Sequence, residues 1–275
     1  MMQELQNVAC RVFEKSERPT ELPFSIYTSE SLQDIKNVPV LKPLLILVLS
    51  GIKELGTQRE IVCSAGEFIF LSNSLDIDMK NIPAGQGYRA ILIEFETSDF
   101  TQFTVQPERP VNGLHYSKGK LNQVLFQSIY QFVEIASSLP PEVQHFRRQE
   151  LLQLMVLSGF DWVPQMAAQF ILSHKVSEII QRDIAAEINA EQMADELMMS
   201  ESTLRRKLKE EGTSVSTLRS RIRLGKGLHL LQTTSIQIGR IAECCGYQSQ
   251  SRFTDQFKRL FGMTPRELLK TRMPD

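Results

Sequence analysis

Cysteine, histidine, tryptophan and long apolar runs are all scarce in this sequence of 275 residues. Its four cysteines (Cys10, Cys63, Cys244 and Cys245) follow no metal-ligand or disulfide spacing, which favours a reducing compartment. The longest apolar run, 43–52, is far shorter than the about 20 residues that a membrane span needs. Because the amino terminus also lacks the apolar core of a secretory signal, we expect a cytoplasmic protein with no membrane partner.

Motifs for catalysis are missing as well. The four histidines are scattered along the chain, and none lies in the β-rich stretch 24–96, where a catalytic metal site would need them. The sequence has no serine nucleophile elbow, no phosphate-binding P-loop and no glycine-rich dinucleotide turn. An enzyme with a DNA-targeting tail would need a reactive cysteine among cations. Cys10 and Cys63 have no obvious basic neighbours in the sequence apart from Arg11. These absences predict a protein that is not an enzyme, with no catalytic residue, metal or cofactor.

The net charge of −1 conceals a division along the chain. Residues 1–170 carry 14 Lys and Arg against 19 Asp and Glu, whereas residues 171–275 carry 17 against 13. The excess rises to 15 against 7 from residue 201 onward. A basic segment joined to an acidic one favours a carboxyl-terminal module that faces a polyanion.

The hydrophobic rhythm divides the chain at about the same place. Between about residues 20 and 112, short β-rich runs alternate with turn residues, which predicts a barrel or sandwich. Helical patterns over about 118–160 have two open interpretations, a cover for the sheet or a homodimer contact. We expect a two-domain α+β protein: a β-rich domain over 1–160, a linker over 161–170 and an all-α domain over 171–275.

Within the helical half, two segments resemble each other, 190–212 and 238–262. Each has a small residue in its first helix (Ala194 and Ala242), then a turn, a polar segment and a second helix with apolar residues four apart. This order is typical of a helix-turn-helix, whose second helix lies in the major groove of DNA.

The second helices carry, on their open sides, the groups that read base edges: Arg for guanine, Gln for adenine, and Ser or Thr for either. We predict DNA contacts by Ser202, Thr203, Arg205, Arg206 and Lys209 in the first unit, and by Gln250, Ser251, Arg252, Thr254, Asp255 and Lys258 in the second. Asp255 has two open roles, accepting from cytosine or holding a neighbouring cation. Arg221, Arg223 and Lys226, on the joining helix, are interpreted as phosphate contacts or plain surface.

The stretch SIQIGRIAECCGYQSQSRFTDQFKRLFGMTPRELLKTR resembles the carboxyl-terminal signature of the AraC/XylS family of transcription regulators, and the resemblance extends from about Val176 onward. It implies two helix-turn-helix units joined by a long helix, a cupin-like amino-terminal domain that senses a small molecule or dimerises, and sequence-specific DNA binding. It also implies an activator in the bacterial cytoplasm, associated with the nucleoid when bound and with RNA polymerase as a partner.

Two features depart from the family pattern. Met198 stands where the first turn usually has glycine, so this turn needs either another backbone or a left-handed methionine. Gly225 and Gly227 lie within the joining helix, where each costs about 1 kcal/mol against alanine. We hypothesise that they let this helix bend and so tune the spacing of the two units.

The apolar strands suggest a hydrophobic or amphipathic effector such as a fatty acid, which some virulence activators of the family bind. Cations available for its carboxylate are Lys42, Lys53, Arg59 and Arg89. A packed barrel without ligand is the other interpretation. The alternative function is that of a DNA-architectural protein of low specificity with such a packed amino-terminal domain.

Overall fold

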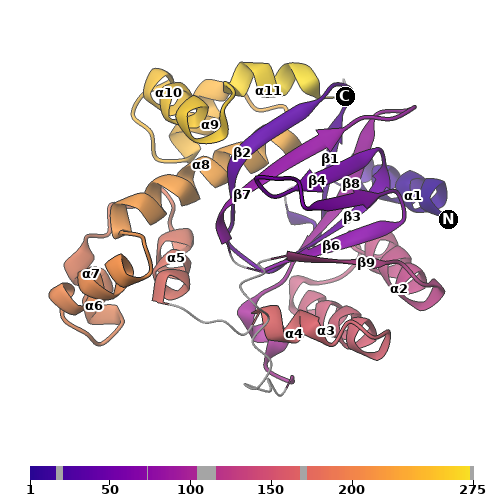
Figure 1. Ribbon diagram of the computed structural model, residues 1–275, viewed down its shortest axis with the longest axis horizontal. Helices are drawn as coiled ribbons and strands as arrows, with labels where there is room; N and C mark the ends of the chain where they lie inside the picture. The colour runs from indigo at the N-terminus through magenta and orange to yellow at the C-terminus, as the bar shows by residue number, and fades with distance from the viewer. Residues whose placement is uncertain (17–20, 73, 104–115, 168–171, 273–275) are drawn as a thin grey trace.

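The structure is a computed structural model that describes residues 1–16, 21–72, 74–103, 116–167 and 172–272. Its amino-terminal half contains two antiparallel sheets (Figure 1). In sheet order, the first consists of β1 (Ser25–Ser29), β8 (Tyr88–Glu94), β3 (Leu44–Ser50), β6 (Glu67–Leu71) and β9 (Tyr116–Lys120). The second consists of β2 (Gln33–Val40), β7 (Ser74–Ile82), β4 (Ile52–Leu55) and β5 (Ile61–Ser64). The β-rich fold expected from the sequence is confirmed.

Alternation along the strands sends side chains to two separate cores. On β3, Leu45 and Leu47 pack against helices, whereas Ile46 and Val48 lie in the core between the two sheets. This is the period of two that a pleated strand imposes. Because both faces of β3 are buried, its sequence is a continuous apolar run rather than an alternating one.

Helices cover the outer face of the five-stranded sheet: α1 (Met2–Lys15), α2 (Gln123–Glu134), α3 (Pro141–Leu157) and α4 (Trp162–Ala167) (Figure 1). Of the two interpretations of segment 118–160, the cover for the sheet is therefore seen, although residues 118–120 belong to β9. The segment 161–170, expected to be a linker, contains α4 and then passes outside the described residues.

The carboxyl-terminal half is helical, as expected. It consists of α5 (Leu172–Arg182), α6 (Ala190–Glu196), α7 (Glu201–Glu210), α8 (Val215–Thr233), α9 (Ile238–Cys244), α10 (Gln250–Phe261) and α11 (Pro265–Thr271). Leu204 and Leu208 of α7 share a core with α5 and the start of α8. Phe253 and Phe257 of α10 share another with the end of α8. Helix α8 therefore joins two small cores.

The two glycines of α8 serve close packing in this arrangement. The helix runs unbroken across both. A Cβ on Gly227 would lie 2.7 Å from a ring carbon of Phe253, and one on Gly225 would lie 2.8 Å from Cγ of Pro39. Because these two glycines have no side chain, α10 and the β-rich domain can approach α8 closely. The bending hypothesis did not include this packing role.

The two halves are joined mainly along β2. Ile35 lies in the same core as the phenylalanines of α10. The Asn37 side chain donates a hydrogen bond to the Leu260 carbonyl (2.9 Å), and the Gln33 amide donates one to the Thr271 hydroxyl (2.8 Å). The second helix-turn-helix unit therefore rests on the edge strand of the four-stranded sheet.

Candidate nucleic-acid interface and adjoining cavity

The two helix-turn-helix units repeat one plan (Figure 1). The supporting helices α6 and α9 begin 48 residues apart, and their small residues Ala194 and Ala242 are both buried. The second helices, α7 and α10, begin 49 residues apart, so the second turn has one more residue. Each second helix starts at a serine, Ser200 or Ser249, whose hydroxyl accepts the backbone N–H three residues on.

The turns differ in how they reach the left-handed conformation. Gly246 adopts φ of 76° at no steric cost, whereas Met198 adopts φ of 54° with its side chain 94% exposed. Of the two backbones left open for the first turn, the left-handed methionine is the one observed. It stores strain of about 1–2 kcal/mol.

The open side of α7 carries the predicted groups. Arg205 and Arg206 are largely exposed and pair with Glu201 and Glu210 one turn away on the same helix, at 2.5 and 2.6 Å. Such exposed pairs contribute only about 0.3–0.5 kcal/mol, so DNA can replace them. Ser202 and Lys209 are exposed too, while Thr203 is half-buried beside the cap.

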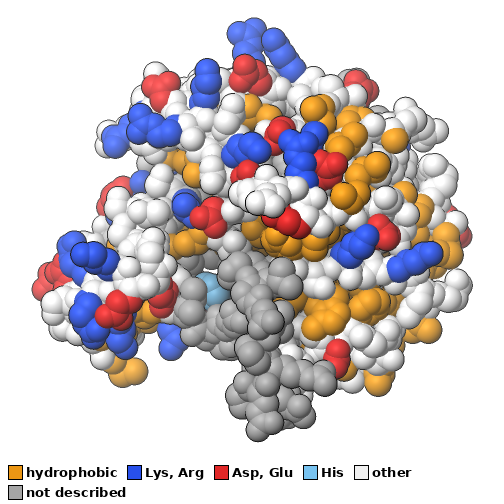
Figure 2. Space-filling view, in the orientation of Figure 1, with side chains coloured by type: hydrophobic (Ala, Val, Ile, Leu, Met, Phe, Trp, Pro, Cys, Tyr) orange, Lys and Arg blue, Asp and Glu red, His pale blue; other side chains and the backbone are white. Residues whose placement is uncertain are grey.

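On α10, Phe253, Phe257 and Phe261 are fully buried and thereby turn the opposite face outward. That face exposes the predicted Gln250, Ser251, Arg252, Asp255 and Lys258, with Thr254 half-buried. Asp255 forms no ion pair with any described residue. Figure 2 shows basic side chains, interspersed with acidic ones, over both helix-turn-helix units.

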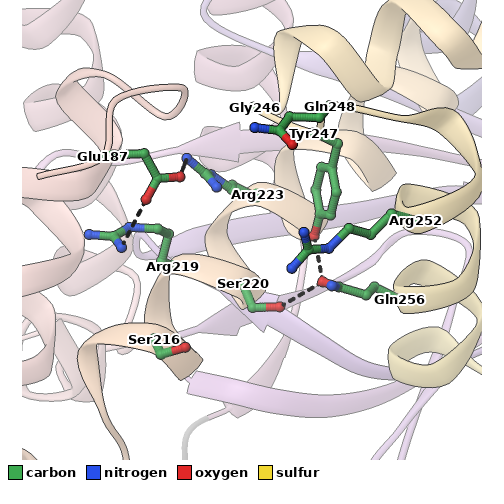
Figure 3. A pocket seen from close by; sticks show the side chains of 10 residues that line it. All are labelled: Glu187, Ser216, Arg219, Ser220, Arg223, Gly246, Tyr247, Gln248, Arg252 and Gln256. Atoms are coloured by element: carbon green, nitrogen blue, oxygen red, sulfur yellow. Dashed lines mark hydrogen bonds and ion pairs between the residues drawn. The ribbon is translucent and has the colours of Figure 1, made fainter.

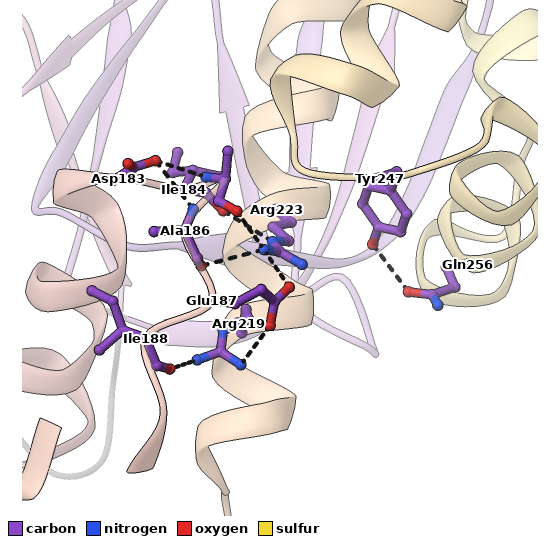
Figure 4. A network of polar contacts seen from close by, with 10 residues as sticks. Asp183, Ile184, Ala186, Glu187, Ile188, Arg219, Arg223, Tyr247 and Gln256 are labelled. Atoms are coloured by element: carbon purple, nitrogen blue, oxygen red, sulfur yellow. Dashed lines mark hydrogen bonds and ion pairs between the residues drawn. The ribbon is translucent and has the colours of Figure 1, made fainter. Parts of the chain in front are cut away.

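Two predicted phosphate contacts on α8 are engaged inside the molecule instead. Arg223 donates to the carbonyls of Ile184, Ala185 and Ala186 and pairs with Glu187 at 3.0 Å (Figure 4). Arg221 donates to the Leu75 carbonyl at 2.7 Å in the β-rich half. Neither is plain surface in this arrangement, and their phosphate role stays a prediction.

A polar groove of about 360 Å³ lies between α8, the segment at Glu187 and the second unit (Figure 3). Arg219 and Arg223 of α8 line one side, and Arg252 of α10 lines the other, beside Gln256. Gln256 accepts a hydrogen bond from the Tyr247 hydroxyl at 3.0 Å. The sequence prediction missed this groove. Its signal was the spacing of Arg219 and Arg223, four residues apart on one helical face.

A larger cavity, of about 460 Å³, lies between the β-rich half and α8. Of the four predicted effector-binding cations, Lys42 and Lys53 line it. Arg59 pairs with Asp34 and Glu54 away from the cavity, and Arg89 is also not among the lining residues. Of the two interpretations left open, a cavity or a packed barrel, a cavity is seen, but at the boundary of the two halves.

Ionisable groups in the cavity have shifted pKa values. Burial, with a smaller effect of Lys226, lowers the pKa of His229 to about 4, and its ring nitrogen lies 3.1 Å from the Tyr27 hydroxyl. Burial raises the pKa of the Glu94 carboxyl, against the influence of Lys42 and Lys226. The sequence prediction missed His229 and Glu94 here, since only the packing of α8 on the sheet brings them together.

Metal binding, thiol reactivity and membrane insertion each place their own requirements on the described residues. They contain no cluster of three or more His, Cys, Asp and Glu side chains able to hold a metal ion. Burial raises the pKa values of Cys10, Cys63 and Cys245, which opposes thiolate formation. No described helix combines the length and apolar character that crossing a membrane requires.

Comparisons with known proteins agree with this geometry. A helix-turn-helix domain family model matches residues 193–271. The transcriptional regulator GadX of Escherichia coli is 42% identical over 93 residues, 34% of each chain. SirC of Salmonella typhimurium is 34% identical over 113 residues, 41% of this chain and 38% of SirC. The chain thus spans about a third of the length of these relatives.

Solved structures extend the likeness to the whole fold. An apo form of ToxT from Vibrio cholerae superposes with a TM-score of 0.67 over 91% of this chain and 97% of ToxT, at 15% identity. A ToxT structure with bound unsaturated fatty acid has a TM-score of 0.63, over 91% and 95% of the two chains, at 13% identity. The two-domain fold therefore resembles that of ToxT, and residues 193–271 form a helix-turn-helix domain similar to those of the regulators GadX and SirC.

Proposed function

We propose that this chain is a sequence-specific transcription regulator, an activator that binds promoter DNA, contacts RNA polymerase and catalyses no reaction. The carrying observation is the pair of outward polar faces on α7 and α10, held by the single helix α8. Two second helices joined in this way are suited to neighbouring major grooves on one side of the duplex.

The groups on the two faces have distinct roles in this proposal. Arg205 or Arg206 donates a forked pair of hydrogen bonds to a guanine, and Gln250 pairs with an adenine. The groove with Arg219 and Arg252 lies between α8 and α10, where its cations would contact the DNA backbone and contribute affinity without sequence choice.

The test is selection of binding sites from random DNA by the full chain, followed by competition against unrelated duplex. Arg206→Ala and Gln250→Ala are each expected to cost about 1–3 kcal/mol on the selected site and to relax preference at one base position. Arg240→Ala is the matched control, because Arg240 is equally exposed and paired, but lies on the supporting helix α9. A specificity ratio near one would favour the architectural function instead.

We also propose that an amphipathic carboxylate such as a fatty acid is the effector and occupies the cavity between the halves. Support comes from the apolar and cationic lining, and from the ToxT structure with bound fatty acid. Because α8 forms one wall, a ligand there can alter the relative placement of the two DNA-binding units. Native mass spectrometry of the purified protein, with and without dodecanoate, tests occupancy; an unchanged mass at saturating dodecanoate would contradict it.

A homodimer through α2 and α3 is the remaining part of the proposal. Val124, Phe146 and Leu157 of these helices are more than half exposed although apolar. Light scattering after size-exclusion chromatography is expected to give a dimer mass, and Phe146→Asp to give a monomer. A monomeric parent chain would contradict this part alone.

A further inference from the structure

Lys53, on the inner face of β4, is a buried cation without a matching anion. Only 3% of the residue is exposed, yet it lines the cavity. Its ammonium donates one hydrogen bond, to the Asn81 side chain (2.8 Å), and lies 5.7 Å from the centre of the Tyr88 ring. No described carboxylate forms an ion pair with it. Burial lowers the pKa of Lys53 to about 8, so the ammonium form still predominates at neutral pH.

The polar groups around Lys53 are also incompletely satisfied. The Tyr88 hydroxyl is buried without a hydrogen-bond partner among the described residues, although Tyr88 itself is not among the residues that line the cavity. Asn81 accepts from Lys53 through its amide oxygen and donates its amide hydrogen to Gln33 at 2.8 Å, and as an uncharged group it does not neutralise the ammonium. A buried cation that lines a cavity and has no carboxylate partner favours an anionic ligand group that can accept its hydrogen bonds.

The two more exposed lysines that line the cavity differ from Lys53, because each has a carboxylate nearby. Lys42 forms a 2.7 Å ion pair with Glu96, and both are substantially exposed. Lys226 is exposed and lies close enough to Glu94 to influence the pKa of its carboxyl. The protein therefore already supplies carboxylates near these two lysines, whereas Lys53 has none.

We propose that Lys53 receives the anionic head of the cavity's ligand, which enters head first and leaves its tail toward the mouth. This assignment rests on the proposed effector function and adds the orientation of the ligand. The tail would then lie along the apolar part of the lining and reach Pro39 and Gly225, where α8 meets β2. Tail length, rather than head chemistry, would act on the contact between the two halves.

The first test measures binding of dodecanoate and of dodecanol to the full chain by calorimetry. Lys53→Met is expected to weaken dodecanoate binding by about tenfold or more, the loss of a charged hydrogen bond, and to leave dodecanol within about twofold. The matched control, Lys42→Met, removes the same charge at the mouth and is expected to change dodecanoate binding by less than about threefold. The reverse order of the two variants would overturn the proposal.

The second test needs no variant and covers the case in which Lys53→Met fails to fold. In crystals of the parent chain with 12-bromododecanoate, the anomalous bromine peak is expected near Pro39 and Gly225. A peak beside Lys53 and Asn81 would mean the opposite orientation and would overturn the proposal while leaving the effector function intact. If the parent chain binds neither dodecanoate nor dodecanol, both the proposal and the effector function fail, whereas DNA selection is unaffected.

Discussion

The two helix-turn-helix units have the same plan but different surroundings. The core of the first, with Leu204 and Leu208, is made chiefly by helices α5 to α8. The core of the second, with Phe253 and Phe257, includes Ile35 from β2 of the other domain. The first unit can therefore reorient at little cost to its own packing, whereas the second cannot leave the sheet without exposing part of its core.

The second unit is therefore the one that packs directly on the β-rich half through β2. Strand β2 is an edge strand, and α10 and α11 cover it through Ile35, Asn37 and Gln33. Edge strands expose unpaired backbone groups that proteins usually protect. A ligand that moved α8 and the second unit away from the sheet would expose this edge strand, so its binding free energy would have to offset the loss of these contacts.

The largest expected effect comes from truncating equivalent core residues of the two units. Phe257→Ala should lower the free energy of unfolding by about 3–5 kcal/mol and Leu208→Ala by about 2–5 kcal/mol, because both side chains are fully buried. Hydrogen exchange is the measurement that separates the units. Phe257→Ala should reduce protection in β2 as well as in α10, whereas Leu208→Ala should leave β2 unchanged.

Equal loss of protection in β2 from both variants would contradict the comparison. Val176→Ala, which truncates a buried residue of α5 in the first core, provides the control. It should behave like Leu208→Ala, since neither residue touches the second core.

Much of this arrangement could be predicted from the sequence, and the reasons are local. Phe253, Phe257 and Phe261 define a helical face by spacing alone, and Ala194 and Ala242 mark the close helix crossings. The strands β2 and β7 cannot be recognised from an alternating apolar pattern, because the buried positions Gln33 and Asn81 are polar. The packing of α8 on the sheet depends on contacts more than a hundred residues apart, as between Tyr27 and His229, which no local pattern encodes.

Acidification should act selectively on the contact of α8 with the β-rich half. His229 has a folded pKa of about 4 against an ordinary value of 6.5, so the unfolded state binds more protons between these values. Stability is therefore full above about pH 6.5 and decreases as the pH falls toward 4, by about 2 kcal/mol at pH 5. Urea unfolding at pH 7 and pH 5 measures this, and His229→Asn should flatten the dependence.

Tyr27, Lys226 and Glu94 also face this site, and Glu94 provides the control. Its raised pKa favours the folded state as the pH falls, which opposes the effect of His229. Glu94→Gln should therefore steepen the loss of stability on acidification. A shallower dependence in Glu94→Gln would show that His229 does not govern the contact.

Substitutions in the two turns should change the free energy of unfolding in opposite directions, because one removes a side chain from a left-handed residue and the other adds one. Met198→Gly relieves a left-handed methionine that packs against little, and should raise the free energy of unfolding by about 0.5–1 kcal/mol. Gly246→Ala should lower it by about 1–2 kcal/mol, because φ is 76° and the new Cβ would lie 3.0 Å from the Arg223 guanidinium. Thermal unfolding of the two variants tests this, and shifts of the same sign would contradict it.

The smallest expected effect concerns the serine caps, where the two units should be alike. Ser200 and Ser249 accept the N–H of Thr203 and Arg252 at 3.2 and 3.3 Å. Because both caps are exposed, Ser200→Ala and Ser249→Ala should each cost about 1 kcal/mol, and the matching Ser→Asp changes should restore most of it. Urea unfolding gives both values. A cost at Ser249 much larger than that at Ser200 would mean that the contact with β2 stabilises α10 from its first turn, so that even the start of the second recognition helix depends on the sheet.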